Sequence, residues 1–419
     1  MQNGELIELD ITGVAHGGVF VAREPEGRVV FVTDTLPGER VRARVTEVKK
    51  SFARAETVEV LEASPERVSY VWQGASDDDR PGGADFGHIS LSHQRALKAQ
   101  VLREAFEKFA GLEIDAAVVG PEAVLGERHP AVAATLDGLR YRTRVSLHVD
   151  EAGRIGPYAQ RSHRVVDVDD YPLATAEIAE VALALRSAPE GRVDLVQPSD
   201  GQIRTIRRPA RKPGRGQRAP RIEPEVVTEL VGDREFRVDA GGFWQVHRAA
   251  AEVLTREAAD LLGDLESDAW NLDLYGGVGL FASVLGERGG GARLTTVEAS
   301  ARAAMHAEAN LAEFGAEALD LRVERFLAQL SNQASLFDRE MITRGVALLD
   351  PPRSGAGREV VETLADLGPS RVAYVACDPV ALARDVGTFR GVGYRLEQLR
   401  AYDLFPQSHH VEAIAILSR

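Results

Sequence analysis

Two side chains near the end of the sequence have types and spacing suited to covalent catalysis. Cys377, the only cysteine among the 419 residues, directly follows the apolar run 372–376 and precedes Asp378 and Pro379. Glu412 stands 35 residues later, where another apolar run opens. A lone cysteine is most often a small buried side chain, and a glutamate beside a histidine is most often a surface residue. Cys377, however, follows a predicted parallel strand, and α/β enzymes place their chemistry at the carboxyl ends of such strands.

A glycine-rich turn at 271–282, NLDLYGGVGLFA, indicates a ligand site of another kind. An apolar strand ends near Asp273, and a helix begins near Leu280. Glycines between them allow the backbone to approach a ligand closely. The second strand ends at Glu298, where its carboxylate is placed to bind ribose hydroxyls, and a third strand, 346–349, ends at Asp350. The turn and Glu298 alone fit either NAD or S-adenosylmethionine.

Five motifs together resemble the RNA uracil-5-methyltransferase family, whose members make 5-methyluridine with S-adenosylmethionine. They span roughly the last 180 residues in the family's order: FWQVH (243–247), LDLYGGVG (272–279), DPPRSG (350–355), ACDP (376–379) and FPQSHHVE (405–412). The resemblance implies that Cys377 is the nucleophile and Glu412 the base. It also implies a cofactor pocket formed by Gln245, Tyr275, Gly277, Glu298 and Asp350, with Gln245 and Asp350 also near the target uracil.

The implied chemistry requires these two catalytic roles. Uracil C5 is a weak nucleophile, and adding a thiolate to C6 concentrates negative charge on C5. After methyl transfer a base must remove the C5 hydrogen before the thiolate can leave. The target base must also leave its stack to reach Cys377, so base flipping is expected.

Three domains are expected from the pattern of elements. Residues 1–62 contain five short strands with turn signals between them (5–11, 18–22, 28–32, 40–48 and 55–62) and resemble the RNA-binding TRAM barrel. Residues 63–245 form a central β-rich RNA-binding domain, with strand composition at 141–150, 153–159, 164–168, 192–197 and 235–240. Residues 246–419 form a Rossmann-like α/β catalytic domain that ends in an antiparallel hairpin at the sheet edge. Helical periodicity over 91–109 predicts a helix capped by Gly111, which we expect to pack on the catalytic domain.

Basic residues with an interleaved aromatic suggest an RNA surface on the barrel, at Arg42, Lys49, Lys50 and Phe52. The segment 204–221 contains eight basic residues and no acid, and its prolines and glycines exclude a helix. It is either a solvated loop or a loop that orders on RNA phosphates.

Composition limits the remaining possibilities. The net charge of −14 argues against a protein that coats DNA, and no apolar window is long enough to cross a membrane. Without a secretory signal the protein is expected to be cytoplasmic, and we expect a monomer. The family often has a Cys-Gly-Gly-Cys core of an iron–sulfur site, and the matching stretch here, 80–85, contains no thiol. We therefore expect no iron–sulfur cluster and no metal, and other contacts must support this stretch.

Several alternatives remain at this point. The RNA is expected to be 23S ribosomal RNA because of the TRAM-like barrel, with transfer RNA as the alternative. A DNA cytosine C5 enzyme is disfavoured because neither a proline before Cys377 nor an asparagine after Glu412 is present. An NAD-dependent dehydrogenase and an inactive RNA-binding protein are the other candidates. The third polar position on the cofactor side, near residues 320–324, has no clear match, and His247 replaces the family's more usual asparagine.

Overall fold

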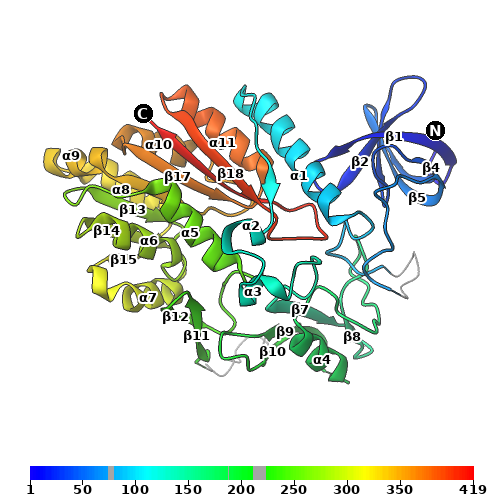
Figure 1. Ribbon diagram of the computed structural model, residues 1–419, viewed down its shortest axis with the longest axis horizontal. Helices are drawn as coiled ribbons and strands as arrows, with labels where there is room; N and C mark the ends of the chain where they lie inside the picture. The colour runs from blue at the N-terminus through cyan, green and yellow to red at the C-terminus, as the bar shows by residue number, and fades with distance from the viewer. Residues whose placement is uncertain (74–79, 187, 211–222) are drawn as a thin grey trace, which may run out of the picture.

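The computed structural model describes residues 1–73, 80–186, 188–210 and 223–419 (Figure 1). A closed barrel at the N-terminus, a large sheet with helices on both faces and a smaller group of antiparallel strands make up the molecule. Within the described residues, no helix has the length and apolar character needed to cross a membrane.

The barrel consists of five strands joined in the order β1-β2-β3-β5-β4. Alternating buried side chains such as Phe20, Val30 and Val41 fill its interior, as expected for short strands with one inward face. All five predicted strands are confirmed, and β1 runs four residues further than predicted. The strands are β1 (Leu6–Ala15), β2 (Val19–Arg23), β3 (Val29–Thr33), β4 (Arg40–Val48) and β5 (Phe52–Glu62).

The predicted helix after the barrel is present and connects two cores. It comprises α1 (Leu91–Ala105) and a π-helical turn (Phe106–Ala110), and Gly111 ends it with a φ of 60°. Leu97 packs in the core of the barrel, whereas Leu102 and Phe106 belong to the core of the large sheet. The helix therefore fixes the barrel beside the large sheet.

A buried ion pair strengthens this junction. Lys98 of α1 is fully buried, and its Nζ donates to Asp403 Oδ1 at 2.5 Å and to the carbonyl of Phe405 at 3.0 Å. A charge buried this deeply requires such partners. Residues 403–410 thus lie against α1, and Figure 1 shows this loop extending from the large sheet toward the barrel.

The central region forms a four-stranded antiparallel sheet in the order β10-β9-β7-β8 and a hairpin, β11-β12. Two predictions are wrong here. Residues 164–168 form only an isolated bridge, Tyr158 to Val165, and residues 204–209 form strand β10 instead of a loop. The rest of the basic segment, 211–221, lies outside the described residues. The elements are β7 (Arg144–Val149), β8 (Ile155–Gly156), α4 (Ala176–Ala184), β9 (Gly191–Val196), β10 (Arg204–Pro209), β11 (Val226–Val231) and β12 (Arg234–Asp239).

The large sheet has the order β15-β14-β13-β16-β17-β19-β18-β6. Strands β13 to β17 are parallel, and β19 runs antiparallel to both β17 and β18. The expected C-terminal hairpin is present, but β6 adds beyond β18, so the hairpin is not the edge of the sheet. The strands are β6 (Val118–Val119), β13 (Trp270–Leu274), β14 (Arg293–Glu298), β15 (Glu317–Asp320), β16 (Val346–Leu349), β17 (Arg371–Ala376), β18 (Arg395–Tyr402) and β19 (Glu412–Ser418).

Helices cover both faces of this sheet, which explains why every residue of its inner strands β13 and β16 is buried. One face buries α5 (Ala250–Leu262), α6 (Leu280–Gly289) and α7 (Ala301–Asn310), and the other buries α1, α8 (Val323–Gln333), α9 (Leu336–Arg344), α10 (Arg358–Leu367) and α11 (Pro379–Gly391). The short helices are α2 (Glu122–Leu125), α3 (Pro130–Ala133) and the 3-10 turn Ala312–Phe314. The predicted Rossmann-like α/β class is confirmed.

Candidate functional site

A cavity of about 830 Å³ lies at the carboxyl ends of the parallel strands. We call it the Cys377 cavity. The structure brings all seven site residues predicted from the sequence into its lining: Gln245, Tyr275, Gly277, Glu298, Asp350, Cys377 and Glu412. They come from six separate segments, so their convergence is a property of the fold.

Cys377 occupies the turn between β17 and α11. Asp378 caps α11, because its Oδ1 accepts hydrogen bonds from the backbone N–H of Val380 (3.0 Å) and Ala381 (2.8 Å). Pro379 at the first helical position stiffens the same turn. Cys377 is therefore held between a buried strand and a capped helix.

The thiol of Cys377 faces two carboxyl groups and one cation. Burial raises its pKa to about 12, with the charges of Glu412 and Asp350 acting in the same direction and that of Arg353 opposing them. At neutral pH the thiol is therefore protonated.

The ladder between β17 and β19 places Glu412 next to Cys377. Ala376 pairs with Ala413 in this antiparallel register, so the next step of the two chains brings residues 377 and 412 together. Burial raises the pKa of Glu412 well above its usual value, and Asp350 adds to the shift while Arg353 opposes it. Burial also raises the pKa of Asp350 to about 7, with a contribution from Asp273.

The glycine turn is closely packed against β14. A Cβ on Gly276 would lie 2.0 Å from Thr296 Oγ1 and 2.4 Å from Asp273 Oδ2. Those two atoms belong to a buried pair in which Thr296 donates to Asp273 at 2.8 Å. Gly277, with a φ of +57°, lines the cavity and has no atom within 4 Å of the place where a Cβ would lie. The turn therefore needs glycine at 276 for packing and leaves room for a ligand at 277.

Glu298 is fixed at the end of β14 by two backbone N–H groups. Its Oε2 accepts from Gly277 at 3.1 Å and its Oε1 accepts from Ser300 at 2.7 Å. The N–H of Gly277 is thus already engaged by a carboxylate, which disfavours a dinucleotide diphosphate at this helix N-terminus.

Charge in the cavity lining favours a cationic ligand. Arg142 and Arg353 are the cations of this lining, and the acids are Asp85, Asp239, Glu298, Asp350 and Glu412. The raised pKa values of Asp350 and Glu412 reduce their negative charge near neutral pH, but the lining still offers carboxyl oxygens that attract a sulfonium and an ammonium group. The donor set therefore fits S-adenosylmethionine.

The structure adds lining residues that sequence reasoning did not assign. Phe243 lies at the cavity with 74% of its surface exposed, and His410 and Phe405 line it from the loop before β19. Phe243 and Arg353 stand inside recognised motifs, but only the structure reveals the exposed ring. Burial lowers the pKa of His410 to about 3, so this ring is neutral.

His247, the residue that departs from the family pattern, has a structural place. It is buried, its ring stacks on Tyr141 at 5.0 Å, and its Nδ1 accepts from the N–H of Ala249 at 3.0 Å. Burial lowers its pKa to about 3, which keeps the ring neutral and able to accept this bond.

The stretch 80–85, where the sequence predicted other support, is held by several contacts. Gly82 N–H donates to Tyr158 O at 2.9 Å, and Asp85 Oδ2 lies 2.6 Å from His409 Nδ1. Ala84 joins Trp72 and Tyr171 in one apolar core, where the two rings meet edge to face at 6.1 Å. Packing and hydrogen bonds thus hold this segment against the Cys377 cavity.

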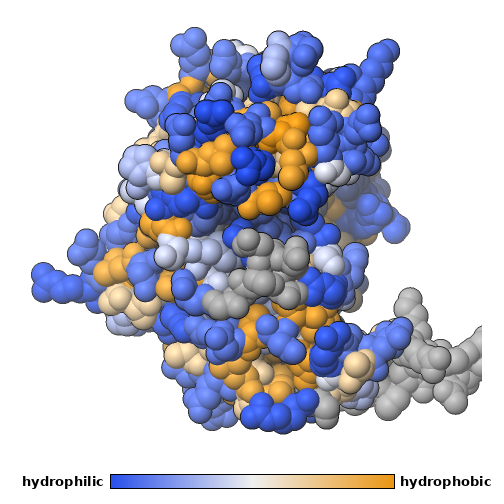
Figure 2. All heavy atoms as spheres, turned by 90° about the vertical axis from the view of Figure 1, so that its right-hand side faces the viewer, coloured by the Kyte–Doolittle hydropathy of each residue, from blue (hydrophilic) through white to orange (hydrophobic). Residues whose placement is uncertain are grey.

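Many of the barrel's basic side chains are paired with acids. Arg42 binds Glu59 at 2.6 Å and Lys49 binds Glu47 at 2.7 Å, whereas Lys50 forms no ion pair among the described residues. Figure 2 looks onto the side of the molecule that carries the barrel, and hydrophilic side chains cover much of its surface there. The predicted phosphate contacts of Arg42 and Lys49 would require these pairs to loosen.

Comparison with known proteins agrees with this architecture. A TRAM domain model matches residues 1–58, and a tRNA (uracil-5-)-methyltransferase model matches residues 222–419. An uncharacterized RNA methyltransferase of Streptomyces avermitilis is 38% identical over 99% of this chain and 98% of its own. A 23S rRNA (uracil(1939)-C(5))-methyltransferase of Halomonas elongata is 30% identical over 98% of this chain and 89% of its own.

A solved structure shares the fold across the whole chain. The Pyrococcus abyssi tRNA (uracil-54, C5)-methyltransferase in complex with S-adenosyl-L-homocysteine aligns with a TM-score of 0.68 at 20% identity, covering 98% of this chain and 99% of that one. Full-length relatives, both family models and the shared fold lead to one assignment. The chain belongs to the RNA uracil-5-methyltransferase family and is an S-adenosylmethionine-dependent RNA methyltransferase with an N-terminal TRAM domain.

Proposed function

We propose that the protein methylates C5 of one uridine in 23S ribosomal RNA through a covalent bond between Cys377 and C6 of the base. The observation that carries this proposal is the position of Glu412 beside Cys377, in the cavity that also contains the glycine turn. We retain 1–62, 63–245 and 246–419 as the proposed limits of the barrel, the central domain and the catalytic domain.

In this mechanism Cys377 gives its thiol proton to solvent water, and the thiolate adds through Sγ to C6 of the flipped uracil. The addition moves an electron pair onto C5 and O4, and C5 becomes nucleophilic. S-adenosylmethionine would supply an electrophilic methyl group for C5. Glu412 then takes the C5 hydrogen as a proton, the C5–C6 double bond reforms, and the thiolate leaves C6. The raised pKa of Glu412 makes its carboxylate a stronger base than an exposed glutamate.

We assign the cofactor to Gln245, Tyr275, Gly277, Glu298 and Asp350. Glu298 is oriented by its two backbone donors, and its remaining lone pairs are available for ribose hydroxyls. Asp350 follows β16, the strand between β13, which precedes the glycine turn, and β17, which precedes Cys377. This position places it near both the methyl group and the uracil. The exposed ring of Phe243 offers a surface on which the flipped base can stack.

The choice of ribosomal RNA rests on the barrel and on the relative from Halomonas elongata, which is named for 23S rRNA. Transfer RNA is the alternative. Mapping 5-methyluridine in RNA from a deletion strain distinguishes them, since the modification should disappear from one site of 23S rRNA and remain in transfer RNA. Loss from transfer RNA alone would assign the enzyme to that substrate, and no loss from either would refute the proposal.

A further inference from the structure

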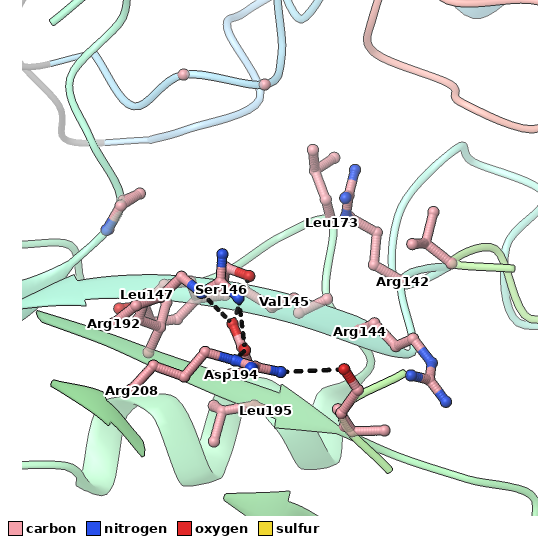
Figure 3. A pocket seen from close by; sticks show the side chains of 18 of the residues that line it. Arg142, Arg144, Val145, Ser146, Leu147, Leu173, Arg192, Asp194, Leu195 and Arg208 are labelled. Carbon is pink, nitrogen blue, oxygen red and sulfur yellow. Dashed lines mark hydrogen bonds and ion pairs between the residues drawn. The ribbon is translucent and has the colours of Figure 1, made fainter. Parts of the chain in front are cut away.

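A second cavity, of about 420 Å³, lies on the central sheet beside the Cys377 cavity (Figure 3). We call it the arginine cavity. Strands β7, β9 and β10 form its floor, and Gly82, Gly83 and the segment 240–242 contribute to its walls. Its volume falls within the range of small-ligand pockets. The proposed reaction at Cys377 does not use it.

Four arginines and a single carboxylate line this cavity. Asp194 binds two of the guanidinium groups, Arg192 at 2.9 Å and Arg208 at 2.6 Å, and Figure 3 shows both converging on it. Arg142 forms no ion pair with a carboxylate among the described residues. Arg144 is paired with Glu229 at 2.9 Å, so the positive charge that an anion could balance comes from Arg142 and from the Arg192–Asp194–Arg208 group.

Arg208 is held in place before any ligand arrives. Its Nε donates to Asp194 and its Nη2 donates to Gly241 O at 3.0 Å. Asp194 is in turn held by the hydroxyl of Ser146 at 2.7 Å. A fixed guanidinium loses little freedom when it binds a phosphate, which favours specific recognition.

Two buried donors of the lining have no acceptor among the residues that the structure describes. Trp72 is 8% exposed, and its Nε1 has no hydrogen-bond partner among the described residues. The side chain of Arg144 is 10% exposed, and its Nε has no partner among them either. Buried N–H groups without acceptors are rare and destabilising. Both nitrogens are closed off from solvent, so a ligand in the cavity would contact them only after the neighbouring side chains move.

The arginine cavity borders the Cys377 cavity. Gly83, Arg142, Gly242 and Val246 line both. The Trp72–Tyr171 pair and Leu173 add aromatic and apolar surface, which suits a base better than a bare anion.

We propose that the arginine cavity holds a second nucleotide of the RNA, close in the chain to the uridine that enters the Cys377 cavity. The arginines bind its phosphate, and the aromatic and apolar wall contacts its base. The inference rests on the proposed function, because it takes the RNA to be the substrate of the neighbouring cavity. It adds a site at which the enzyme reads a position other than its target.

Strand β10 provides a matched pair of variants for the test. Arg208 lines the cavity, whereas its neighbour Arg207 is exposed and does not, since successive side chains of a strand point to opposite faces. Arg208→Gln should weaken RNA binding about tenfold, and Arg207→Gln by no more than about twofold. Binding is measured in the presence of S-adenosylhomocysteine with 23S rRNA and transfer RNA transcripts, so the result does not depend on turnover.

Trp72→Phe is a second variant, which keeps an aromatic ring but removes the indole N–H and part of the ring surface of the wall. It should also weaken RNA binding while leaving the affinity for S-adenosylhomocysteine unchanged. Melting temperatures of all three variants check that they fold. Equal losses from Arg208→Gln and Arg207→Gln would mean that these arginines act only as diffuse surface charge, and would overturn the proposal.

Removing single bases identifies the bound nucleotide. At one position near the target uridine, an abasic residue should weaken binding to the wild type and to Arg207→Gln but have no further effect on Arg208→Gln. Absence of such coupling at every position would overturn the proposal. In another contrary outcome, free AMP or phosphate stabilises the wild type but not Arg208→Gln, while Arg208→Gln keeps normal affinity for RNA. That result would also overturn the proposal, because the cavity would then bind a free ligand and not the RNA. If wild type binds RNA with this coupling but methylates nothing, the proposed function fails and the second site stands.

Discussion

His16 Nε2, in the loop between β1 and β2, lies 2.8 Å from Oδ2 of Asp378, the residue that follows Cys377. The two are 362 positions apart in the chain. Because Asp378 also caps α11, one carboxylate links the barrel to the turn that carries the thiol. The barrel is thus in direct contact with the catalytic turn, beyond its connection through α1.

This ion pair should make the junction sensitive to pH. The hydrogen bond to Asp378 raises the pKa of His16 above 6.5, opposed by burial and by Arg384. The pKa of Asp378 lies below 3.8 because hydrogen bonds and the charge of His16 outweigh burial. The contribution of this ion pair to the free energy of unfolding is therefore complete between about pH 4 and 6.5. It is lost at higher pH, as His16 loses its proton through its raised pKa. It is also lost in acid, as Asp378 becomes protonated.

His16→Gln keeps a hydrogen bond and removes the charge. The difference in unfolding free energy between wild type and variant should be below about 1 kcal/mol, because 44% of the His16 side chain is exposed. Denaturant titrations at pH 5.5 and 9 measure it, and the difference should shrink at pH 9. A difference that grows toward pH 9 would contradict the assigned ion pair.

A second prediction separates two neighbouring glycines. Gly276→Ala should lower the unfolding free energy by about 1–3 kcal/mol, because its Cβ would enter the Thr296–Asp273 pair. Gly277→Ala meets no atom within 4 Å and should cost only about 1–2 kcal/mol for its positive φ. Gly277 lines the cavity, so the affinity for S-adenosylmethionine should fall more than tenfold. Calorimetry and thermal melts distinguish the two variants, and unchanged binding by Gly277→Ala would remove this turn from the cofactor site.

A third prediction concerns metal content. The protein purified without added iron should be colourless and free of stoichiometric iron, since one cysteine cannot bind an iron–sulfur cluster. Treatment with a chelator should leave its melting temperature unchanged. A broad visible absorbance band accompanied by iron would show that the contacts around Trp72, Ala84 and Tyr171 are not what supports the stretch 80–85.

The parts predicted from sequence are those with a strong local pattern. Strands β13, β16 and β17 are buried and mostly apolar, and the motif residues at their ends meet because parallel strands end at one edge. The contact of His16 with Asp378 has no local signal. Strand β10 reads as a loop because its exposed arginines lack an apolar alternation, and its pairing with β9 supplies the stabilisation that its composition does not reveal.

The opposite error occurred at residues 164–168. Val165 and Val166 have the composition of a strand, which led to the prediction. Both side chains are buried, so they do not alternate between a buried and an exposed face as in a strand with one solvent-exposed side. The arginine cavity was not predicted because its residues come from many separate segments, and only tertiary structure brings them together.

The ionisation of Cys377 can be tested without RNA, because the chain has no other thiol. The rate of alkylation by iodoacetamide should still be rising at pH 10, given a pKa of about 12. Glu412→Gln removes a negative charge and should lower that pKa, so alkylation becomes faster at a given pH. Arg353→Gln removes the opposing cation and should make it slower. A rate that levels off below pH 8 in the wild type would contradict the burial and the carboxyl neighbours of this thiol.

The last prediction separates the roles of Cys377 and Glu412 with labelled RNA on a denaturing gel. Cys377→Ala should methylate nothing and form no covalent adduct, because the bond to C6 requires the thiol. Glu412→Gln resembles the protonated glutamate in shape, so addition and methyl transfer should proceed, and the product should remain attached because the C5 hydrogen has no acceptor. Wild type with 5-fluorouridine RNA should stop at the same stage, since fluorine cannot leave as a cation. Shifted bands are therefore expected for the wild type with fluorouridine RNA and for Glu412→Gln, and none for Cys377→Ala. An adduct that persists in Cys377→Ala would refute the mechanism, because that variant contains no thiol at all.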